Sequence, residues 1–238
     1  MILEDLFIFE ELMDRTRGRD RGRPGGAGGP TVLFIGNDAG PTSGDDGAVM
    51  THLESLFGAA NVTYVQGSAS VTGDMVGKSL GIISSTVSSS SVRGKFNSLT
   101  VPQMTWEEAL YKTASGDYCM SSSSAKPVTD TINVVLDTHP IMVAAGLSNG
   151  NNVIMTSSQT TSCPQGTIPA GATVLAELPT DATCKCLLVC NSGGVDQCGG
   201  NFPARRASFP AENSSFGDLN AAGLNLFNAT LDWLLGII

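Results

Sequence analysis

The sequence predicts an α/β domain built on a mainly parallel sheet, and three observations support this fold class. Residues 32–35 form a short, continuously apolar run, which is typical of a strand buried on both faces of a sheet. The run ends in a glycine- and acid-rich turn, 36–46, after which a helix is expected. Short apolar runs then alternate with helical patterns as far as residue 105, as in successive β–α–β units with right-handed crossovers.

The elements of the first half follow in order. Residues 45–57 place Val49, Leu53 and Leu56 on one face of a helix, and Gly58 is a suitable end for it. The remaining expected elements are strands at 61–66, 80–84 and 101–105, and a helical turn at 75–76.

The second half changes character, because loops rather than long helices separate its strand-like runs. Such runs are typical of antiparallel strands, which would either extend the sheet or form a flap. Residues 220–235 place Leu224, Phe227, Leu231 and Leu234 at helical spacing, which predicts a closing helix that packs on the sheet. The expected strands are 131–136, 152–156, 173–178 and 185–190.

The chain divides into three parts. Residues 1–14 are a short amphipathic segment, which is either a helix or a frayed tail. Residues 15–30 are rich in arginine and glycine and predict a flexible linker, because they cannot bury apolar surface. The folded domain is therefore expected at 31–238. The apolar stripe within residues 2–13 would be costly to leave in water, so docking on a second copy, as a homo-oligomer or filament, is one expectation. A remnant of a longer precursor is the other.

Charge and hydropathy exclude two classes of partner. The formal net charge is −9, and from Thr31 onward eight basic residues face sixteen acidic ones. We therefore expect no binding to nucleic acid or to anionic lipid. No apolar run approaches the ~20 residues that a membrane-spanning helix needs.

Cysteines and glycosylation sequons favour an extracellular or cell-surface location. Six cysteines form an even set, and most are expected to be paired. A zinc cluster is the less favoured interpretation, since the spacing of Cys184 and Cys186 is unusual for structural zinc. The N-terminus nevertheless lacks the basic-then-apolar order of a signal peptide. The disulfide candidates are Cys119, Cys163, Cys184, Cys186, Cys190 and Cys198, and the glycosylation candidates are Asn61, Asn213 and Asn228.

Six segments of the chain, taken together with their order, resemble the class I glutamine-amidotransferase-like superfamily, near its ThuA-like and uncharacterised non-catalytic branch. The resemblance covers most of the chain from Thr31 to Gly236. It implies a flavodoxin-like three-layer sandwich with a mainly parallel sheet. The segments are 32–36, 82–90, 101–107, 138–147, 203–206 and 220–233.

Catalytic members of that superfamily place a cysteine in the turn after the strand that corresponds to 101–105. The turn in this chain, Met104-Thr105-Trp106, contains no cysteine, which excludes thiolate attack there. The Thr105 hydroxyl would need an adjacent base. His52 is expected to be exposed or to pack on its helix, and His139 to cap a loop. We therefore predict no catalytic residue and a non-enzymatic structural or recognition module.

Polar residues follow several of the expected parallel strands and would line a crevice at their carboxyl ends. Carboxylates there suit Ca²⁺, Mg²⁺ or sugar hydroxyls, although Asp45 and Asp46 more simply cap a helix, so no metal is expected. Trp106 would either stack on a sugar or lie in the core. The acidic neighbours oppose a phosphate, so we expect no flavin and no other cofactor. The alternative function is a ThuA-like carbohydrate-processing enzyme that uses Asp38, Glu107 or His139, or a sugar-binding protein. The crevice candidates are Asn37, Asp38, Ser84, Ser85, Thr105, Trp106 and Glu107.

Overall fold

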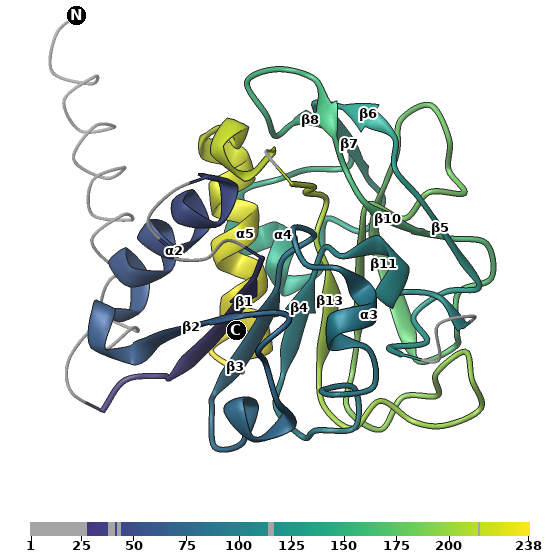
Figure 1. The fold of residues 1–238 in the computed structure, drawn as a ribbon. Helices are drawn as coiled ribbons and strands as arrows, with labels where there is room; N and C mark the ends of the chain where they lie inside the picture. Colours follow the sequence, from purple (N-terminus) through teal and green to yellow (C-terminus); the bar gives the residue numbers. More distant parts are fainter. Residues whose placement is uncertain (1–27, 38–40, 42–43, 114–116, 214) are drawn as a thin grey trace, which may run out of the picture.

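The computed structural model describes residues 28–37, 41, 44–113, 117–213 and 215–238 (Figure 1). The amphipathic segment 1–14, most of the expected linker and Asp38 lie outside this part of the chain. Nine of the strands form one mixed sheet in the order β2-β1-β3-β4-β13-β12-β11-β7-β8. The predicted α/β class is therefore confirmed.

The first five strands of this order are parallel. β1 (Val32–Gly36) lies between β2 (Val62–Gln66) and β3 (Leu80–Ile83). β4 (Gln103–Thr105) pairs with β3 on one side and with β13 (Arg206–Ser208) on the other. The first four of these strands were predicted from the sequence, whereas β13 was not, because it is short and lies far along the chain.

The rest of the sheet is antiparallel. The second-half strands extend the sheet, which decides between the two arrangements left open by the sequence. They are β12 (Leu187–Cys190), β11 (Ala172–Glu177), β7 (Thr131–Val134) and β8 (Gly150–Val153). Two small antiparallel pairs are separate from the sheet: β5 (Ser123–Ala125) with β10 (Cys163–Gln165), and β6 (Val128–Thr129) with β9 (Gln159–Thr160).

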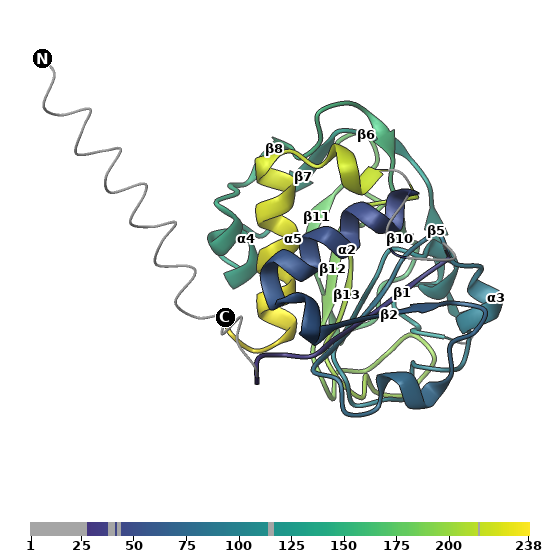
Figure 2. The same cartoon turned by 60° about the vertical axis from the view of Figure 1, so that its left-hand side comes forward.

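The longer helices cover one face of the sheet. Figure 2 shows α2 (Gly44–Phe57), α4 (Pro140–Ala145) and α5 (Ala221–Leu234) side by side on this face. The opposite face carries the short helix α3 (Ser89–Val92) and loops. Short 3₁₀ turns lie at Ala59–Asn61, Thr72–Met75, Glu108–Leu110 and Ser215–Asp218.

Side-chain alternation along β1 builds a core on each face. Val32 and Phe34 pack with the helices α2, α4 and α5, whereas Leu33 and Ile35 pack with residues of the α3 side. All four side chains are fully buried, as the sequence predicted for a strand covered on both faces. The arrangement is compatible with a three-layer sandwich.

The closing helix α5 is held against the sheet by its first turn. The Asn220 side chain caps the helix by accepting a hydrogen bond from the Gly223 amide at 3.0 Å. A Cβ at Gly223 would lie 2.2 Å from the carbonyl oxygen of Ile154, so only glycine allows this approach. No helix in the described residues is long and apolar enough to cross a membrane.

One disulfide joins two distant loops. Cys119, which follows the Glu108–Leu110 turn, is bonded to Cys198 in the loop after β12. The other four cysteines are free, buried thiols, so the expectation that most of the six are paired is not met. Cys186 and Cys190, for example, cannot form a disulfide with each other, because they belong to the cores on opposite faces of the sheet.

Candidate functional site

The carboxyl ends of the parallel strands meet at one edge of the sheet, so the segments that follow β1, β3, β4 and β13 converge there. The structure divides the expected crevice at this edge into two polar groups. One is organised around Asp46 and the other around Glu107 and Glu212.

The polar atoms of the first group are hydrogen-bonded to one another. The buried Asp46 carboxylate accepts hydrogen bonds from the Asn37 amide at 2.8 Å and from the Thr86 hydroxyl at 2.9 Å. The Thr86 hydroxyl also lies 3.0 Å from the Ser84 hydroxyl. A Cβ at Gly36 would lie 2.1 Å from Asp46 Oδ2, which explains the glycine at the end of β1. This carboxylate ties the two loops together, which agrees with a local structural role for Asp46.

The second group we call the carboxyl cluster, and it consists of Ser85, Glu107, Glu108, Lys126 and Glu212. Lys126 Nζ lies 2.5 Å from Glu212 Oε1 and 3.9 Å from Glu108 Oε1. Glu108 Oε2 accepts a hydrogen bond from the Ser124 hydroxyl and forms an ion pair with Lys112 Nζ at 3.2 Å. Glu107 and Glu212 are almost completely buried.

Burial makes these carboxyl groups unlike ordinary surface acids. Burial, followed by the charges of Glu108 and Glu212, raises the pKa of Glu107 to about 7. Burial also raises the pKa of Glu212, although its hydrogen bond to Lys126 opposes this. Burial tends to raise the pKa of Glu108, but Ser124 and Lys112 lower it overall. Near neutral pH the cluster therefore retains a proton that isolated glutamates would release.

Two polar atoms of the cluster have no hydrogen-bond partner among the described residues: Ser85 Oγ and Glu212 Oε2. The Ser85 hydroxyl lies close enough to Glu212 to lower the pKa of its carboxyl group. Their distance and angles do not, however, satisfy the geometry of a hydrogen bond. Buried polar atoms without partners are rare, because leaving them unpaired costs free energy.

A cavity of about 270 Å³ opens beside Glu212. Besides Glu212, its lining supplies a charged amine, two side-chain amides and a hydroxyl. These come from Lys126, Gln159, Thr160 and Asn213. The cavity therefore offers hydrogen-bond donors and acceptors around Glu212.

Two of the expected crevice residues belong to the core. Trp106 is 1 % exposed, and its ring lies between those of Phe34 and Phe227, so of its two expected positions the core is confirmed and stacking on a sugar is excluded. The Thr105 hydroxyl donates to the Ile83 carbonyl at 3.1 Å and accepts from the Glu107 amide at 3.1 Å. These bonds occupy the hydroxyl in local structure, and no base adjoins it among the described residues.

Neither histidine reaches the cluster. The His52 ring packs against Phe216 and Phe227, and its Nε2 lies 2.8 Å from Asn228 Oδ1. His139 Nδ1 accepts a hydrogen bond from the Ile141 amide at 3.3 Å at the start of α4, which confirms its expected capping role. Burial and then the charge of Arg205 lower the pKa of His139.

The three sequon asparagines differ in their surroundings. Asn213 is exposed on the rim of the cavity. Asn61 is half-buried and donates to the Phe57 carbonyl at 2.8 Å. Asn228 is half-buried within α5 and bonded to His52. Asn213 is therefore the candidate best placed to carry a glycan.

Sequence reasoning found Ser85 and Glu107 but missed Lys126, Glu212 and the cavity residues Gln159 and Thr160. Glu212 could have been found by treating 206–208 as a further parallel strand, because Glu212 then falls at its carboxyl end. Lys126 had no such signal, since it lies between two short strands outside the main sheet. Its contact with Glu212 is a tertiary one.

The arrangement provides a proton-holding carboxyl cluster and a polar cavity, but no nucleophile–base pair among the described residues. Comparison with known proteins gives this chain no family, because no protein-family model matches it and no curated protein shows significant similarity to it.

Proposed function

We propose that this protein is a non-enzymatic recognition module that binds a neutral, polyhydroxylated ligand, such as a carbohydrate, in the cavity beside Glu212. The observation that carries this proposal is the almost completely buried Glu212, which pairs with Lys126 and lines the polar cavity. A ligand hydroxyl that donates to the Glu212 carboxylate would form a hydrogen bond to a charged group.

A hydroxyl-rich ligand matches the cavity chemically. Each sugar hydroxyl both donates and accepts, so it can pair with Glu212 while accepting from Lys126 or from the Asn213 amide. The three carboxyl groups of the cluster oppose an anionic ligand. A metal ion is opposed as well, since Lys126 already neutralises Glu212 at 2.5 Å.

The scaffold supports the non-enzymatic part of the proposal. The parallel strands run in the order β2-β1-β3-β4-β13, which corresponds to the 2-1-3-4-5 order of flavodoxin-like sheets. We propose that the fold is flavodoxin-like and related to the glutamine amidotransferases. In that relationship no cysteine follows β4, and the hydroxyl of Thr105, which ends the strand, is already hydrogen-bonded. The Cys119–Cys198 disulfide supports an extracellular or cell-surface setting.

A second function has one specific observation in its favour. Glu107, with a pKa of about 7, can donate a proton near neutral pH, and the charge of Glu212 acts on it from nearby. Paired carboxyl groups of this kind serve as acid and base in glycoside hydrolysis. This alternative is a ThuA-like carbohydrate-processing enzyme. Glu107 does not line the cavity, however, so we rank this function second.

Calorimetric titration with a panel of neutral mono- and oligosaccharides separates the two functions, with chromatography to detect products. The proposal expects saturable binding without product, weakened at least about tenfold in Glu212→Gln. The matched control is Glu54→Gln on α2, which should bind like the wild type. Turnover that Glu107→Gln abolishes would establish the second function. Absence of binding to every sugar in the panel would overturn the first.

A further inference from the structure

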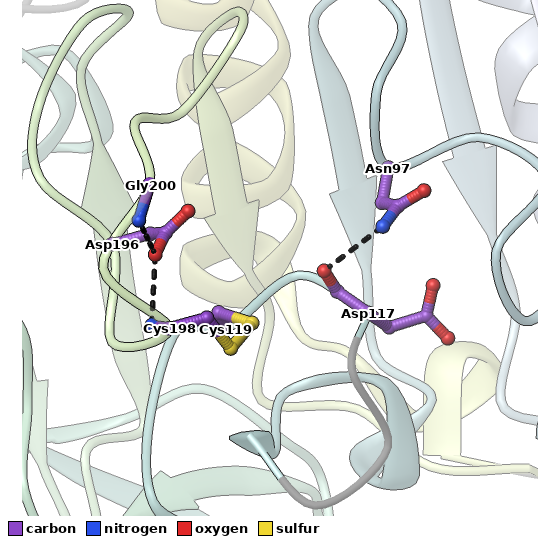
Figure 3. The surroundings of a disulfide bond; sticks show 6 residues. All are labelled: Asn97, Asp117, Cys119, Asp196, Cys198 and Gly200. Atoms are coloured by element: carbon purple, nitrogen blue, oxygen red, sulfur yellow. Dashed lines mark hydrogen bonds between the residues drawn. A yellow bond between two sulfur atoms is a disulfide. The ribbon is translucent and has the colours of Figure 1, made fainter.

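A second polar centre lies at the opposite edge of the sheet, around the disulfide (Figure 3). The cavity next to it is lined by Arg206, which begins β13, and by Asn97 and Ser98, which precede β4. Its location is therefore at the amino ends of the parallel strands, away from the carboxyl cluster. The inference below does not depend on the proposed function.

The sulfur atoms of Cys119 and Cys198 and a carboxylate oxygen of Asp196 all lie within 4.8 Å of one another. Among the described residues this is the only group of three or more acidic, histidine or cysteine side chains packed so closely. Cysteine thiolates and aspartate carboxylates are each ligands that Zn²⁺ takes in proteins.

Asp196 is already oriented toward the disulfide. Its Oδ1 accepts hydrogen bonds from the Cys198 amide at 2.8 Å and from the Gly200 amide at 2.9 Å, as Figure 3 shows. These bonds hold the carboxylate beside the disulfide. Orientation of a ligand by neighbouring hydrogen bonds is typical of metal sites.

We propose that reduction of the Cys119–Cys198 disulfide creates a zinc site, with the two thiolates and the Asp196 carboxylate as protein ligands. Oxidation of the same cysteines abolishes it, so the metal reports the redox state of this loop. Because Asp196 lines the adjacent cavity of about 290 Å³ together with Asn201, we place the fourth position of a tetrahedral ion on the side of that cavity. Water or a small ligand completes the coordination there.

The chemistry requires a dithiol reductant. Its two thiols become a disulfide, and the two electrons and two protons that they give up convert the Cys119–Cys198 bond into two thiols. Zn²⁺ then binds the two sulfurs as thiolates and releases both protons. In a tetrahedral site the sulfurs lie about 2.3 Å from the ion, so they must separate by roughly 2 Å. Cys198 is exposed on a glycine-containing loop, which allows this movement.

The four remaining cysteines do not offer an equivalent site. All are buried, and burial raises the pKa of Cys186 to about 12 and that of Cys163 and Cys190 still higher. These thiols resist the deprotonation that metal binding requires. Cys184 lies beside Cys163, but within the described part of the chain no third ligand lies close enough to both sulfurs to form such a cluster.

The test uses Co²⁺ as a spectroscopic probe on the full chain, after reduction with a dithiol and its removal without oxygen. We expect cobalt–thiolate absorption bands at one ion per chain, displaced by Zn²⁺, and no bands for the oxidised protein. Zinc should also raise the melting temperature of the reduced protein.

Two variants make the assignment specific. Asp196→Asn retains the acceptor for the Cys198 and Gly200 amides but loses the carboxylate, and should bind cobalt at least about tenfold more weakly. The double variant Cys119→Ser/Cys198→Ser keeps the four buried thiols and should show no cobalt–thiolate bands. Bands that persist in the double variant, or their absence from the reduced wild-type protein, would overturn the inference. Because the reduced wild-type chain is itself measured, a folding defect in a variant does not decide the outcome.

Discussion

Lys126 Nζ lies 2.5 Å from Glu212 Oε1, although the two residues are 86 positions apart in the chain. Lys126 lies between the short strands β5 and β6, whereas Glu212 follows the sheet strand β13. The Glu212 side chain is 6 % exposed and that of Lys126 is 43 % exposed, so an accessible amine neutralises a buried carboxylate. This contact keeps one wall of the cavity charged and in place.

Removal of the amine should destabilise the protein in a pH-dependent way. In Lys126→Met the buried Glu212 must either remain charged without a partner or take up a proton. We expect a loss of about 1 to 2 kcal/mol at pH 8, less than for a fully buried pair because Lys126 is partly exposed. The loss should shrink at pH 5, where Glu212 is more easily protonated. Urea unfolding measures both, and the double variant Lys126→Met/Glu212→Gln should recover stability. A loss that is equal at both pH values would contradict this account.

Glu107 should make the protein less stable as pH rises through neutrality. Its pKa is about 7 in the folded state, against 4.5 for the free side chain, so the folded state binds the proton more tightly. The stabilisation is fully present below pH 4.5 and is lost as pH rises to about 7, with a maximum of about 3 kcal/mol. The titration of Glu212 adds to this dependence because its own pKa is raised, and the titration of Glu108 opposes it because its own pKa is lowered. The charge of Lys126 lowers the pKa of Glu107 and so limits the effect.

Unfolding measured between pH 5 and pH 8 tests this dependence. Glu107→Gln keeps an acceptor for the Ala109 amide but cannot titrate, so its stability should vary less with pH than that of the wild type. Glu54→Gln should retain the wild-type slope. If Glu107→Gln has that slope as well, Glu107 does not hold the proton.

The disulfide should be detectable by counting thiols. Alkylation of the unfolded protein without reductant should label four cysteines, and labelling after reduction should reach six, as read by mass spectrometry. The bond closes a loop with a sequence separation of 79 residues, so Cys119→Ser/Cys198→Ser should lose about 4 kcal/mol of stability. Six labelled thiols without reductant would show that the bond is absent.

Asn213 should be the main glycosylated residue when the chain is directed through a eukaryotic secretory route. It is exposed, whereas the Asn228 side chain is half-buried in α5 and bonded to His52. Asn213→Gln should remove the mass of a glycan, and Asn228→Gln should leave the mass of the glycan unchanged. Since Asn213 lines the cavity beside Glu212, its glycan should also weaken sugar binding there. Retention of the full glycan mass by Asn213→Gln would contradict the assignment.

The sequence by itself determined the α/β class, β1 and its two buried faces, α2, and the closing helix α5. These elements could be predicted because local patterns carry their signals: a continuous apolar run for the strand and apolar residues at helical spacing for the helices. The sequence also placed Ser85 and Glu107 at the carboxyl edge, since position relative to a parallel strand fixes the edge.

Only the tertiary structure decided which polar residues work together. The Asp46 carboxylate is bonded to Thr86 and Asn37, and Trp106 is enclosed by aromatic rings, which decides for Trp106 between the ligand site and the core that the sequence left open. Glu212 and Lys126 join the site through a contact between distant segments, as Cys119 joins Cys198. Such pairings depend on how loops approach one another in space and on how burial shifts the pKa of an ionisable group. Neither property is determined by the local sequence.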